Sequence, residues 1–448
     1  MAKIVIIGAG LTGISAAYHL EKAGFFDYLL VEQEATIGGL CRSVVQDGFT
    51  FDYTGHLLHI NDLYVDQLLQ SFLNKDTFFN HINRRSFVYS HATYTHYPFQ
   101  VNLHGLPTAV IAECIEGYVQ RPAATENPAT FYQWVLQNFG EGFARHFFVP
   151  YQEKIFASSV HSITASWTGR FVPATTLTQI IAGAIKEPDQ NTVGYNAAFL
   201  YPREGGTQRW VTAFAEQLLQ PIALNKRVVA IDPAKQSIRF ADGDSCSYEK
   251  IITTIPLPAL LQVTNEQATL RVRQAIPYLQ ASSVVNFNLG IANPLLSDKH
   301  WIYFPEPRYP FYRLGFTSNF AASMAPAGCS SLYGEFAHRT TDTATINNLL
   351  TTSITQTMQL LDISAEEIIT QYIIHIPYAY VLYTPWREKY LPELLATYAQ
   401  HQIYSVGRYG AWKYSSMQEA ILDGKAVVEQ LLHTSWQQHH QQQPELSQ

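Results

Sequence analysis

The first residues of the chain carry a glycine pattern that restricts what they can fold into. Ile4–Ile7 form a continuous apolar run, which is typical of a strand buried on both faces of a parallel sheet. Gly8, Gly10 and Gly13 follow as Gly-x-Gly-x-x-Gly, and residues 14–22 then predict a helix. In such a unit the first glycine makes the tight turn and the second lets a pyrophosphate approach the backbone. The third glycine allows close packing of helix on strand.

An acidic residue stands where a nucleotide-binding unit needs one. Residues 25–31 predict a second strand, and Glu32 follows at its end. A carboxylate in this place binds the ribose hydroxyls of an adenosine. Strand, glycine turn, helix and acid together predict a dinucleotide-binding βαβ unit. The alternative is a glycine turn of purely structural origin.

Length and composition limit the remaining possibilities. A chain of 448 residues favours two or three domains. Its net charge of −7 argues against nonspecific binding of nucleic acid, which needs a basic face. No apolar run reaches the ~18 residues that a membrane-spanning helix needs, so no such segment is expected. The cysteines are scattered without a C-x-x-C pair, which predicts neither disulfides nor a metal site and favours a reducing cytoplasm. They are Cys41, Cys114, Cys246 and Cys329.

A second glycine pair follows the acid. Gly38 and Gly39 stand shortly before Arg42 in the segment ATIGGLCRS. This sequence pattern is typical of flavoproteins of the glutathione-reductase and amine-oxidase type, in which the segment wraps around the phosphate and flavin side of the cofactor. A simple nicotinamide dehydrogenase has no use for it. An ordinary surface turn is the alternative interpretation.

The remaining segments predict a discontinuous α/β fold: a Rossmann-like FAD-binding domain, a mostly helical insertion domain and an antiparallel-sheet substrate domain. The segment IITQYIIHIPYAYV, residues 368–381, predicts one long strand. The Gln- and His-rich end of the chain predicts a disordered tail. The expected boundaries are 1–60 with 195–262 and 400–433 for the FAD-binding domain, 61–194 for the helical domain, 263–399 for the substrate domain and 434–448 for the tail.

Motifs spread over almost the whole chain carry a family resemblance. They are TGH (54–56), YPFQ (97–100), FGEGFARHFFVPYQEKIFA (139–157), SWTGR (166–170), NAAFLYPREGGT (196–207), WIYFPEPRYPFYR (301–313) and GRYGAWKY (407–414). With them the chain resembles the flavin-dependent UDP-galactopyranose mutases, especially their eukaryotic branch. More distantly it resembles amine oxidases and protoporphyrinogen oxidases, which share the scaffold.

The resemblance implies an isomerase that exchanges the pyranose and furanose rings of a nucleotide sugar. In such mutases N5 of reduced FAD attacks the anomeric carbon, and the nucleoside diphosphate leaves and returns. The implied partner is a nucleotide sugar, most simply one linked to UDP. Since no separate nicotinamide motif is visible, a free NAD(P)H that binds transiently is one possible reductant.

The resemblance also implies roles for individual residues. His56, Arg170 and Arg313 match catalytic positions, and both arginines are expected near the diphosphate because forked guanidinium groups suit phosphate oxygens. Tyr303, Tyr380 and Tyr414 match hydroxyls that bind the same diphosphate, and Gln100, Asn196 and Trp301 match the sugar and nucleotide sides. The expected FAD-binding residues are Gly8, Gly10, Thr12, Gly13, Glu32, Gly38, Gly39, Leu40, Arg42, His56, Val228, Gly407, Arg408, Ser416 and Met417.

The chain departs from the family at a few positions. Thr54 stands where the family has a second glycine before the histidine, and Phe156 stands near the family's tryptophan. The segment SSMQEA after Tyr414 lacks the family's Gly-Asn and Asp-His pairs. These changes leave open a different nucleotide sugar. They also leave open an oxidoreductase of the amine-oxidase or protoporphyrinogen-oxidase type, or a flavin-binding regulatory protein.

Overall fold

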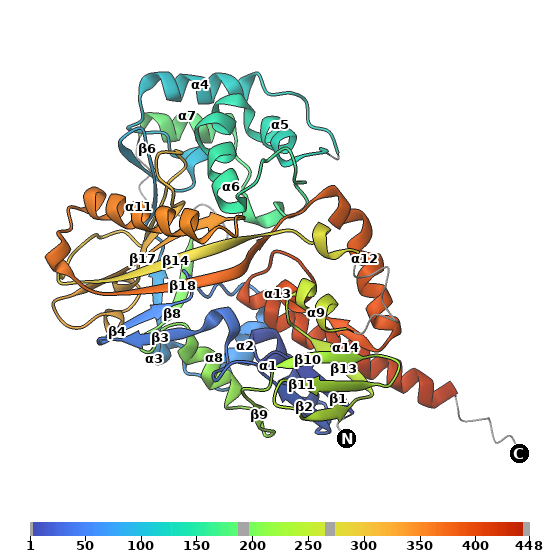
Figure 1. The fold of residues 1–448 in the computed structure, drawn as a ribbon. Coiled ribbons are helices and arrows are strands. Elements are labelled where there is room, and N and C mark those ends of the chain that lie inside the picture. Colours follow the sequence, from blue (N-terminus) through green and yellow to red (C-terminus); the bar gives the residue numbers. More distant parts are fainter. Residues whose placement is uncertain (1–2, 127, 187–196, 265–273, 442–448) are drawn as a thin grey trace, which may run out of the picture.

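Three layers make up the molecule in the computed structural model, which describes residues 3–126, 128–186, 197–264 and 274–441 (Figure 1). A parallel sheet with its helices lies at the bottom of the view, a large antiparallel sheet crosses the middle, and a group of helices lies at the top. This mixed arrangement of helices and sheets confirms the predicted α/β fold class.

The parallel sheet forms around the strand that the sequence predicts first. Strand β1 spans Ile4–Ile7 and is buried along its whole length, as expected of a strand covered on both faces. It pairs in parallel with β2 (Tyr28–Val31) on one side and with β13 (Lys250–Thr253) on the other. The full order is β19-β13-β1-β2-β9, with β9 at Ile222–Ala223 and β19 at Ile403–Ser405. The strands therefore come from three separate stretches of chain, while the division into domains stays a prediction.

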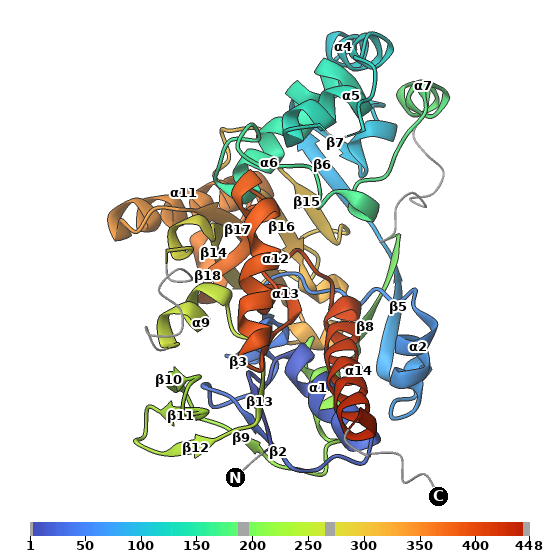
Figure 2. The ribbon, with the colours of Figure 1, turned by 90° about the vertical axis from the view of Figure 1, so that its right-hand side faces the viewer.

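Helices α1 (Leu11–Lys22) and α14 (Met417–Gln441) lie side by side against this sheet (Figure 2). Ser15 Oγ donates a hydrogen bond to the Ile421 carbonyl at 2.6 Å. A Cβ at Gly424 would lie only 2.6 Å from the Ser15 Cβ, so the two helices touch where glycine stands. Helix α14 continues past residue 434, and the end of the predicted tail, residues 442–448, lies outside the described residues.

The second sheet is mainly antiparallel and forms the middle layer. Its order is β18-β14-β17-β16-β15-β6-β7, and the predicted long strand is present as β18, Ile368–Val381. Helix α11 (Thr343–Leu361) packs on this sheet. The other strands are β6 (Ser86–Ser90), β7 (Thr93–His96), β14 (Ala281–Ile291), β15 (Trp301–Tyr303), β16 (Arg313–Phe316) and β17 (Ser330–His338).

The stretch 61–194, predicted as a mostly helical domain, also contains three short strands. Strands β6 and β7 lie in this stretch and extend the second sheet, because β6 pairs in parallel with β15. Strand β5 (Phe79–Asn83) also lies there and pairs with β8 (Ala198–Pro202). The top layer itself is helical. Its helices are α4 (Thr108–Val119), α5 (Phe131–Phe143), a π-helical turn at Ala144–Phe148, α6 (Val149–Phe156) and α7 (Leu177–Ile185).

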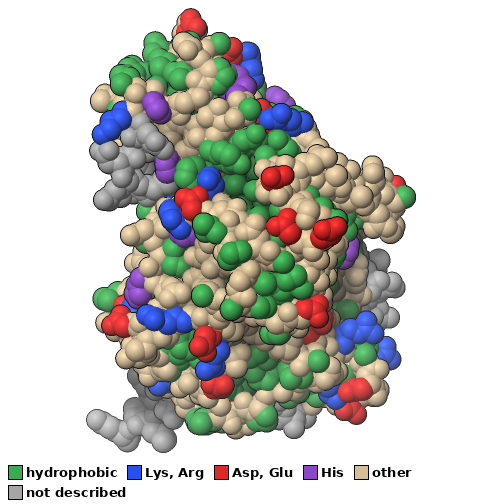
Figure 3. Space-filling view, turned by 90° about the vertical axis from the view of Figure 1, so that its left-hand side faces the viewer, with side chains coloured by type: hydrophobic (Ala, Val, Ile, Leu, Met, Phe, Trp, Pro, Cys, Tyr) green, Lys and Arg blue, Asp and Glu red, His purple; other side chains and the backbone are tan. Residues whose placement is uncertain are grey.

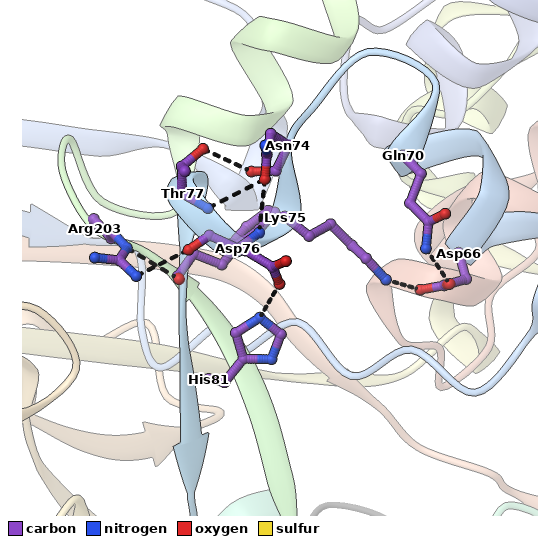
Figure 4. A network of polar contacts seen from close by, with 9 residues as sticks. Asp66, Gln70, Asn74, Lys75, Asp76, Thr77, His81 and Arg203 are labelled. Carbon is purple, nitrogen blue, oxygen red and sulfur yellow. Dashed lines mark hydrogen bonds and ion pairs between the residues drawn. The ribbon is translucent and has the colours of Figure 1, made fainter.

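A polar network fixes the start of the β5–β8 pair (Figure 4). Asn74 caps helix α3 (Lys75–Phe78), because its side chain accepts hydrogen bonds from the Asp76 and Thr77 amides. Arg203, just after β8, donates to the Asp76 carbonyl at 2.9 Å. These bonds hold α3 against the end of β8.

The remaining elements connect these layers. They are β3 (Ser43–Gln46), β4 (Phe49–Asp52), α2 (Leu63–Gln70), α8 (Gln208–Ala215), the sheet of β10 (Val228–Asp232), β11 (Ser237–Phe240) and β12 (Ser245–Ser247), α9 (Leu257–Val263), α12 (Pro385–Gln400) and α13 (Gly407–Gly410). No helix in the described ranges combines the length and the apolar character needed to cross a bilayer. On the face shown in Figure 3, Lys and Arg side chains are scattered among Asp and Glu, so this face has no continuous basic surface.

Candidate functional site

A single cavity of about 920 Å³ runs from the parallel sheet to the antiparallel sheet. The glycine turn after β1 lines one end of it. Arg313, Tyr380 and Tyr414 line the other end. The structure thus brings into one space the two groups of residues that the sequence assigned to a dinucleotide and to a diphosphate.

The glycine turn has the shape that a dinucleotide requires. Gly8 has φ +101°, and a Cβ at Gly13 would lie 1.9 Å from the Gly8 carbonyl oxygen, so neither position accepts a side chain. Gly13 allows the start of α1 to approach the Gly8 carbonyl closely, and it does not line the cavity. Gly10 does line it and makes a β-bridge with Gly38. No side chain caps the N-terminus of α1, so its first amides remain for the phosphates of a cofactor.

Glu32 and Arg42 are held in place beside this turn. Glu32 is buried and accepts hydrogen bonds from the Ala9 amide at 2.8 Å and the Glu34 amide at 3.0 Å. Arg42 Nε donates to the Gly39 carbonyl at 2.8 Å, and the guanidinium lies 4.5 Å from the Tyr53 ring centre. Each carboxylate oxygen of Glu32 has a further lone pair, which can accept a ribose hydroxyl.

The other residues predicted to bind the cofactor lie along the same wall. Those that line the cavity are Thr12, Gly38, Gly39, Leu40, Val228, Gly407, Arg408, Ser416 and Met417. The sequence interpretation missed Thr254, Ile255 and Pro256, which follow β13 and also line it. The signal was available, because ligands of parallel sheets bind at the carboxyl ends of the strands and these residues follow a predicted strand.

His56 lies in the turn after β4 and lines the centre of the cavity. Burial and the Arg408 charge lower the pKa of its imidazole to about 4, so the ring is neutral at pH 7. Thr54, two residues before it, has φ +69°, a conformation that favours glycine. The Thr54 hydroxyl lies 3.2 Å from His56 Nδ1, which gives this strained residue a local partner. The threonine therefore keeps the backbone conformation that a glycine would adopt.

The low pKa of His56 predicts how stability changes with pH. Below the ordinary His pKa of about 6.5, His56 is protonated in the unfolded chain but stays neutral in the folded chain. The free energy of unfolding therefore falls as the pH drops toward 4, by about 1.4 kcal/mol per pH unit. Between pH 7 and pH 5 we expect the melting temperature of His56→Gln to fall less than that of the wild type. His81→Gln, at an exposed histidine, is the control and should follow the wild type. Equal slopes in all three proteins would contradict the buried, neutral state of His56.

Arg313 stands on β16 with its charge already paired. Its Nη2 donates to Glu335 Oε1 at 2.9 Å and to Oε2 at 2.8 Å, and the Glu335 side chain is fully buried. Burial opposes the charge of Arg313, but Glu335 and nearby tyrosines hold the pKa of the guanidinium well above its ordinary value. The other donors of the guanidinium remain for a ligand, and its Nε has no hydrogen-bond partner among the described residues.

Arg408 contributes a second cation to the middle of the cavity. Its Nη1 donates to the Ser415 carbonyl at 2.6 Å and its Nη2 to the Ala379 carbonyl at 3.1 Å. The guanidinium lies 4.9 Å from the ring centre of Tyr414. Within the described ranges no carboxylate pairs with Arg408. The arginines and carboxylates of this region therefore leave a net positive charge that suits an anionic ligand.

Tyrosines surround the two arginines. Tyr303 and Tyr380 are raised in pKa by burial, so their hydroxyls stay protonated and can donate hydrogen bonds. The rings of Tyr380 and Tyr414 stack with centres 6.4 Å apart. Tyr97, Tyr151 and Tyr312 line the cavity as well, and the sequence interpretation did not single them out.

The remaining substrate predictions have different outcomes. Gln100 and Trp301 are buried and line the cavity, and Gln100 Nε2 donates to the Pro173 carbonyl at 3.0 Å. Arg170 lies in the turn Gly169–Phe171, but its side chain falls outside the described part of the structure. Asn196 lies outside the described residues altogether. Both remain predictions.

One face of helix α6 and the turn before it forms a wall that the sequence interpretation named only as a motif. The lining residues are Phe147, Phe148, Tyr151, Gln152, Ile155 and Phe156. Their spacing of three and four residues is that of one helical face, and this period was readable in the sequence. Polar Gln152 and Tyr151 on an otherwise apolar face were the available signal for a ligand contact.

Comparison with solved structures agrees with this geometry. A reduced UDP-galactopyranose mutase is similar over 97% of this chain and 94% of that chain, with 28% sequence identity and a TM-score of 0.89. A protoporphyrinogen oxidase-like protein from Exiguobacterium sp. 255-15 is similar over 96% of this chain and 98% of that chain. It has 16% sequence identity and a TM-score of 0.74, a likeness that shows the shared fold alone.

Curated relatives match over shorter stretches. An uncharacterised protein from Methanothermococcus thermolithotrophicus is 41% identical over 71 residues, which is 16% of this chain and 68% of that protein. A 4,4′-diapolycopene oxygenase from Methylomonas is 46% identical over 50 residues, which is 11% of this chain and 10% of that protein. The family model described as flavin containing amine oxidoreductase matches residues 11–432. The chain therefore belongs to this family of FAD-dependent enzymes.

Proposed function

We propose that the protein is an FAD-dependent nucleotide-sugar mutase that interconverts pyranose and furanose rings. The observation that carries the proposal is the single cavity, in which a dinucleotide turn faces a chamber of buried arginines and tyrosines. An oxidase that acts on an amine or a porphyrinogen has no diphosphate to bind and no need for such a chamber. The 28% identity to a UDP-galactopyranose mutase supports the same choice.

The described residues fit FAD. The amides at the start of α1 and Gly10 suit the pyrophosphate, and Glu32 suits the adenosine ribose. Bound FAD in its reduced form supplies the nucleophile for the anomeric carbon of the sugar. The chain's own groups then have three tasks: to hold the sugar in place, to stabilise the departing diphosphate, and to keep it close enough to return.

The arginines and tyrosines of the cavity suit these tasks through their charges and hydrogen-bond donors. Arg408 supplies a cation that pairs with no carboxylate of the described residues. Arg313 supplies the guanidinium N–H groups other than Nη2, which Glu335 occupies. The hydroxyls of Tyr303, Tyr380 and Tyr414 can donate hydrogen bonds to the phosphate oxygens without adding charge. Neutral His56 adds no second cation beside Arg408. Arg170 and Asn196 belong to the proposed site through their motifs alone.

An anaerobic assay tests the proposal. The purified yellow protein is reduced with dithionite and incubated with a panel of nucleotide sugars that includes UDP-galactose, and the products are separated by chromatography. A new isomer of the parent mass, formed by the reduced protein and not by the oxidised control, is the expected result. Failure to isomerise any sugar in the panel would count against a mutase.

The second candidate is a flavin-dependent oxidoreductase of the amine-oxidase or protoporphyrinogen-oxidase type. The family match favours it, because that family is described by its amine oxidoreductases. Such an enzyme would bleach its oxidised flavin when an amine or a porphyrinogen is added, and it would consume oxygen. The same protein sample tests this reaction, and bleaching without any sugar isomerisation would select the second candidate.

A further inference from the structure

Three residues at the start of helix α12 contact two walls of the cavity without lining it. Tyr383, Arg387 and Glu388 follow the end of β18, and none of them is among the lining residues. We call these three residues the α12 junction. The walls are the loop that carries Tyr414 and the loop that carries Trp167, both of which line the cavity.

The α12 junction fixes the backbone of the Tyr414 loop at two points. The Tyr414 amide donates a hydrogen bond to Tyr383 Oη at 2.7 Å. Arg387 Nε donates to the Trp412 carbonyl at 2.8 Å. Trp412 is fully buried and has φ +49°, a conformation that a tryptophan keeps only when its surroundings impose it.

The same residues hold the Trp167 loop. The Thr164 amide donates to the Tyr383 carbonyl at 2.6 Å. Ser166 Oγ donates to Glu388 Oε1 at 2.7 Å, and Arg387 Nη1 reaches the same oxygen at 3.1 Å. Tyr383 therefore accepts one hydrogen bond from each wall, at its phenol oxygen from the Tyr414 loop and at its backbone oxygen from the Trp167 loop.

Arg387 ties the two sets of bonds together. Its guanidinium is buried and lies 3.7 Å from the ring centre of Tyr383. A planar guanidinium can stack on a ring and at the same time direct N–H groups from different nitrogens at two acceptors, whereas the ammonium of a lysine has a single nitrogen and no plane to stack. The Thr384 hydroxyl accepts a hydrogen bond from the Arg387 amide at 3.2 Å, which fixes the first turn of α12 below the stack.

We propose that Tyr383 and Arg387 are positioning residues that set the distance between the Tyr414 wall and the Trp167 wall of the cavity. Neither residue lines the cavity. The identity of the ligand rests on the proposed function, but the mechanical link between the walls does not.

Tyr383→Phe is the sharpest test, because it removes one hydrogen-bond acceptor and keeps the ring under Arg387. We expect the Tyr414 amide to exchange its hydrogen at least about 5-fold faster, and UDP to bind about 5-fold more weakly to the holoenzyme, the effect of one lost hydrogen bond. FAD content and the flavin absorbance spectrum should stay unchanged. Arg387→Lys should show both effects as well, since it loses the Trp412 hydrogen bond and the stack that holds the Tyr383 ring.

Tyr390→Phe is the control, since this tyrosine stands on the same helix, is partly exposed and has its own lysine contact. It should leave both amide exchange and UDP binding at wild-type values. Unchanged exchange of the Tyr414 amide in Tyr383→Phe would overturn the proposal, and so would faster exchange with unchanged UDP affinity. If the wild type binds no UDP, the proposed function fails, and the exchange measurement alone decides whether the α12 junction holds the loop.

Discussion

Arg313→Ala is expected to weaken UDP binding by about 100-fold or more while the protein keeps its FAD. A charge-assisted hydrogen bond contributes roughly 1.5–3 kcal/mol, and about 1.4 kcal/mol corresponds to a tenfold change in affinity. The guanidinium can supply two such bonds from Nε and Nη1, since Glu335 occupies Nη2. Titration of the holoenzyme with UDP, followed by calorimetry or by the flavin spectrum, measures the loss. Release of FAD by this substitution would show that Arg313 serves the cofactor instead.

The pairing of Arg313 with Glu335 determines the controls. Removing only the arginine leaves a buried carboxylate without its partner, which costs about 3–5 kcal/mol of stability. The double variant Arg313→Ala with Glu335→Gln removes both charges and should recover most of the melting temperature without recovering UDP binding. Arg308→Ala, at a largely exposed arginine of the same segment, should bind UDP like the wild type. Recovery of UDP binding in the double variant would contradict a direct role for Arg313.

Gly10→Ala and Gly13→Ala are expected to fail in different ways. A Cβ at Gly13 would lie 1.9 Å from a backbone oxygen that cannot move aside. Gly13→Ala should therefore disrupt the turn, prevent FAD binding and lower the free energy of unfolding by about 3 kcal/mol. A Cβ at Gly10 would meet nothing closer than the Gly39 Cα at 3.9 Å, so the apoprotein should fold. Its methyl group would enter the cavity, and FAD affinity should drop by about 100-fold. The ratio of flavin to protein absorbance and the melting curve separate the two outcomes.

Each glycine variant checks the other. If Gly13→Ala kept its flavin, the close approach of Gly13 to Gly8 would not be required for the fold. If Gly10→Ala bound FAD as tightly as the wild type, the pyrophosphate would not pass over Gly10. A Gly10→Ala protein that fails to fold would contradict the open space seen around that position.

The sequence revealed elements whose signal is local and strong. Strand β1 and the glycine turn follow a fixed pattern, and β18 is long enough for its apolar residues to predict a strand. The sequence did not predict the hairpin of β6 and β7, because its turn residues, His91 and Ala92, both have positive φ without being Asn or Gly. Such a turn lacks the usual hairpin signature, so nothing in the composition of this stretch separated two short strands from a loop.

The site shows the same limit at longer range. Arg313 could be assigned from its motif, but its partner Glu335 could not, because the two meet only through the register of β16 and β17. Tyr383 is another example, since its contacts bring together residues from three distant parts of the chain. A residue that lines a cavity can belong to a motif. A residue that holds such a residue in place is recognised only when the packing is known.

The order of strands in the parallel sheet has a consequence for how the protein is made. Strand β1 leaves the ribosome long before β19, which lies beyond β13 in the sheet. During synthesis the outer edges of β1 and β2 therefore stay unpaired until β9, β13 and β19 have been made. The cradle for the cofactor can close only after β19 has emerged. We therefore expect FAD to bind only after β19 has been synthesised, and a supply of free FAD in the cell should raise the yield of folded protein.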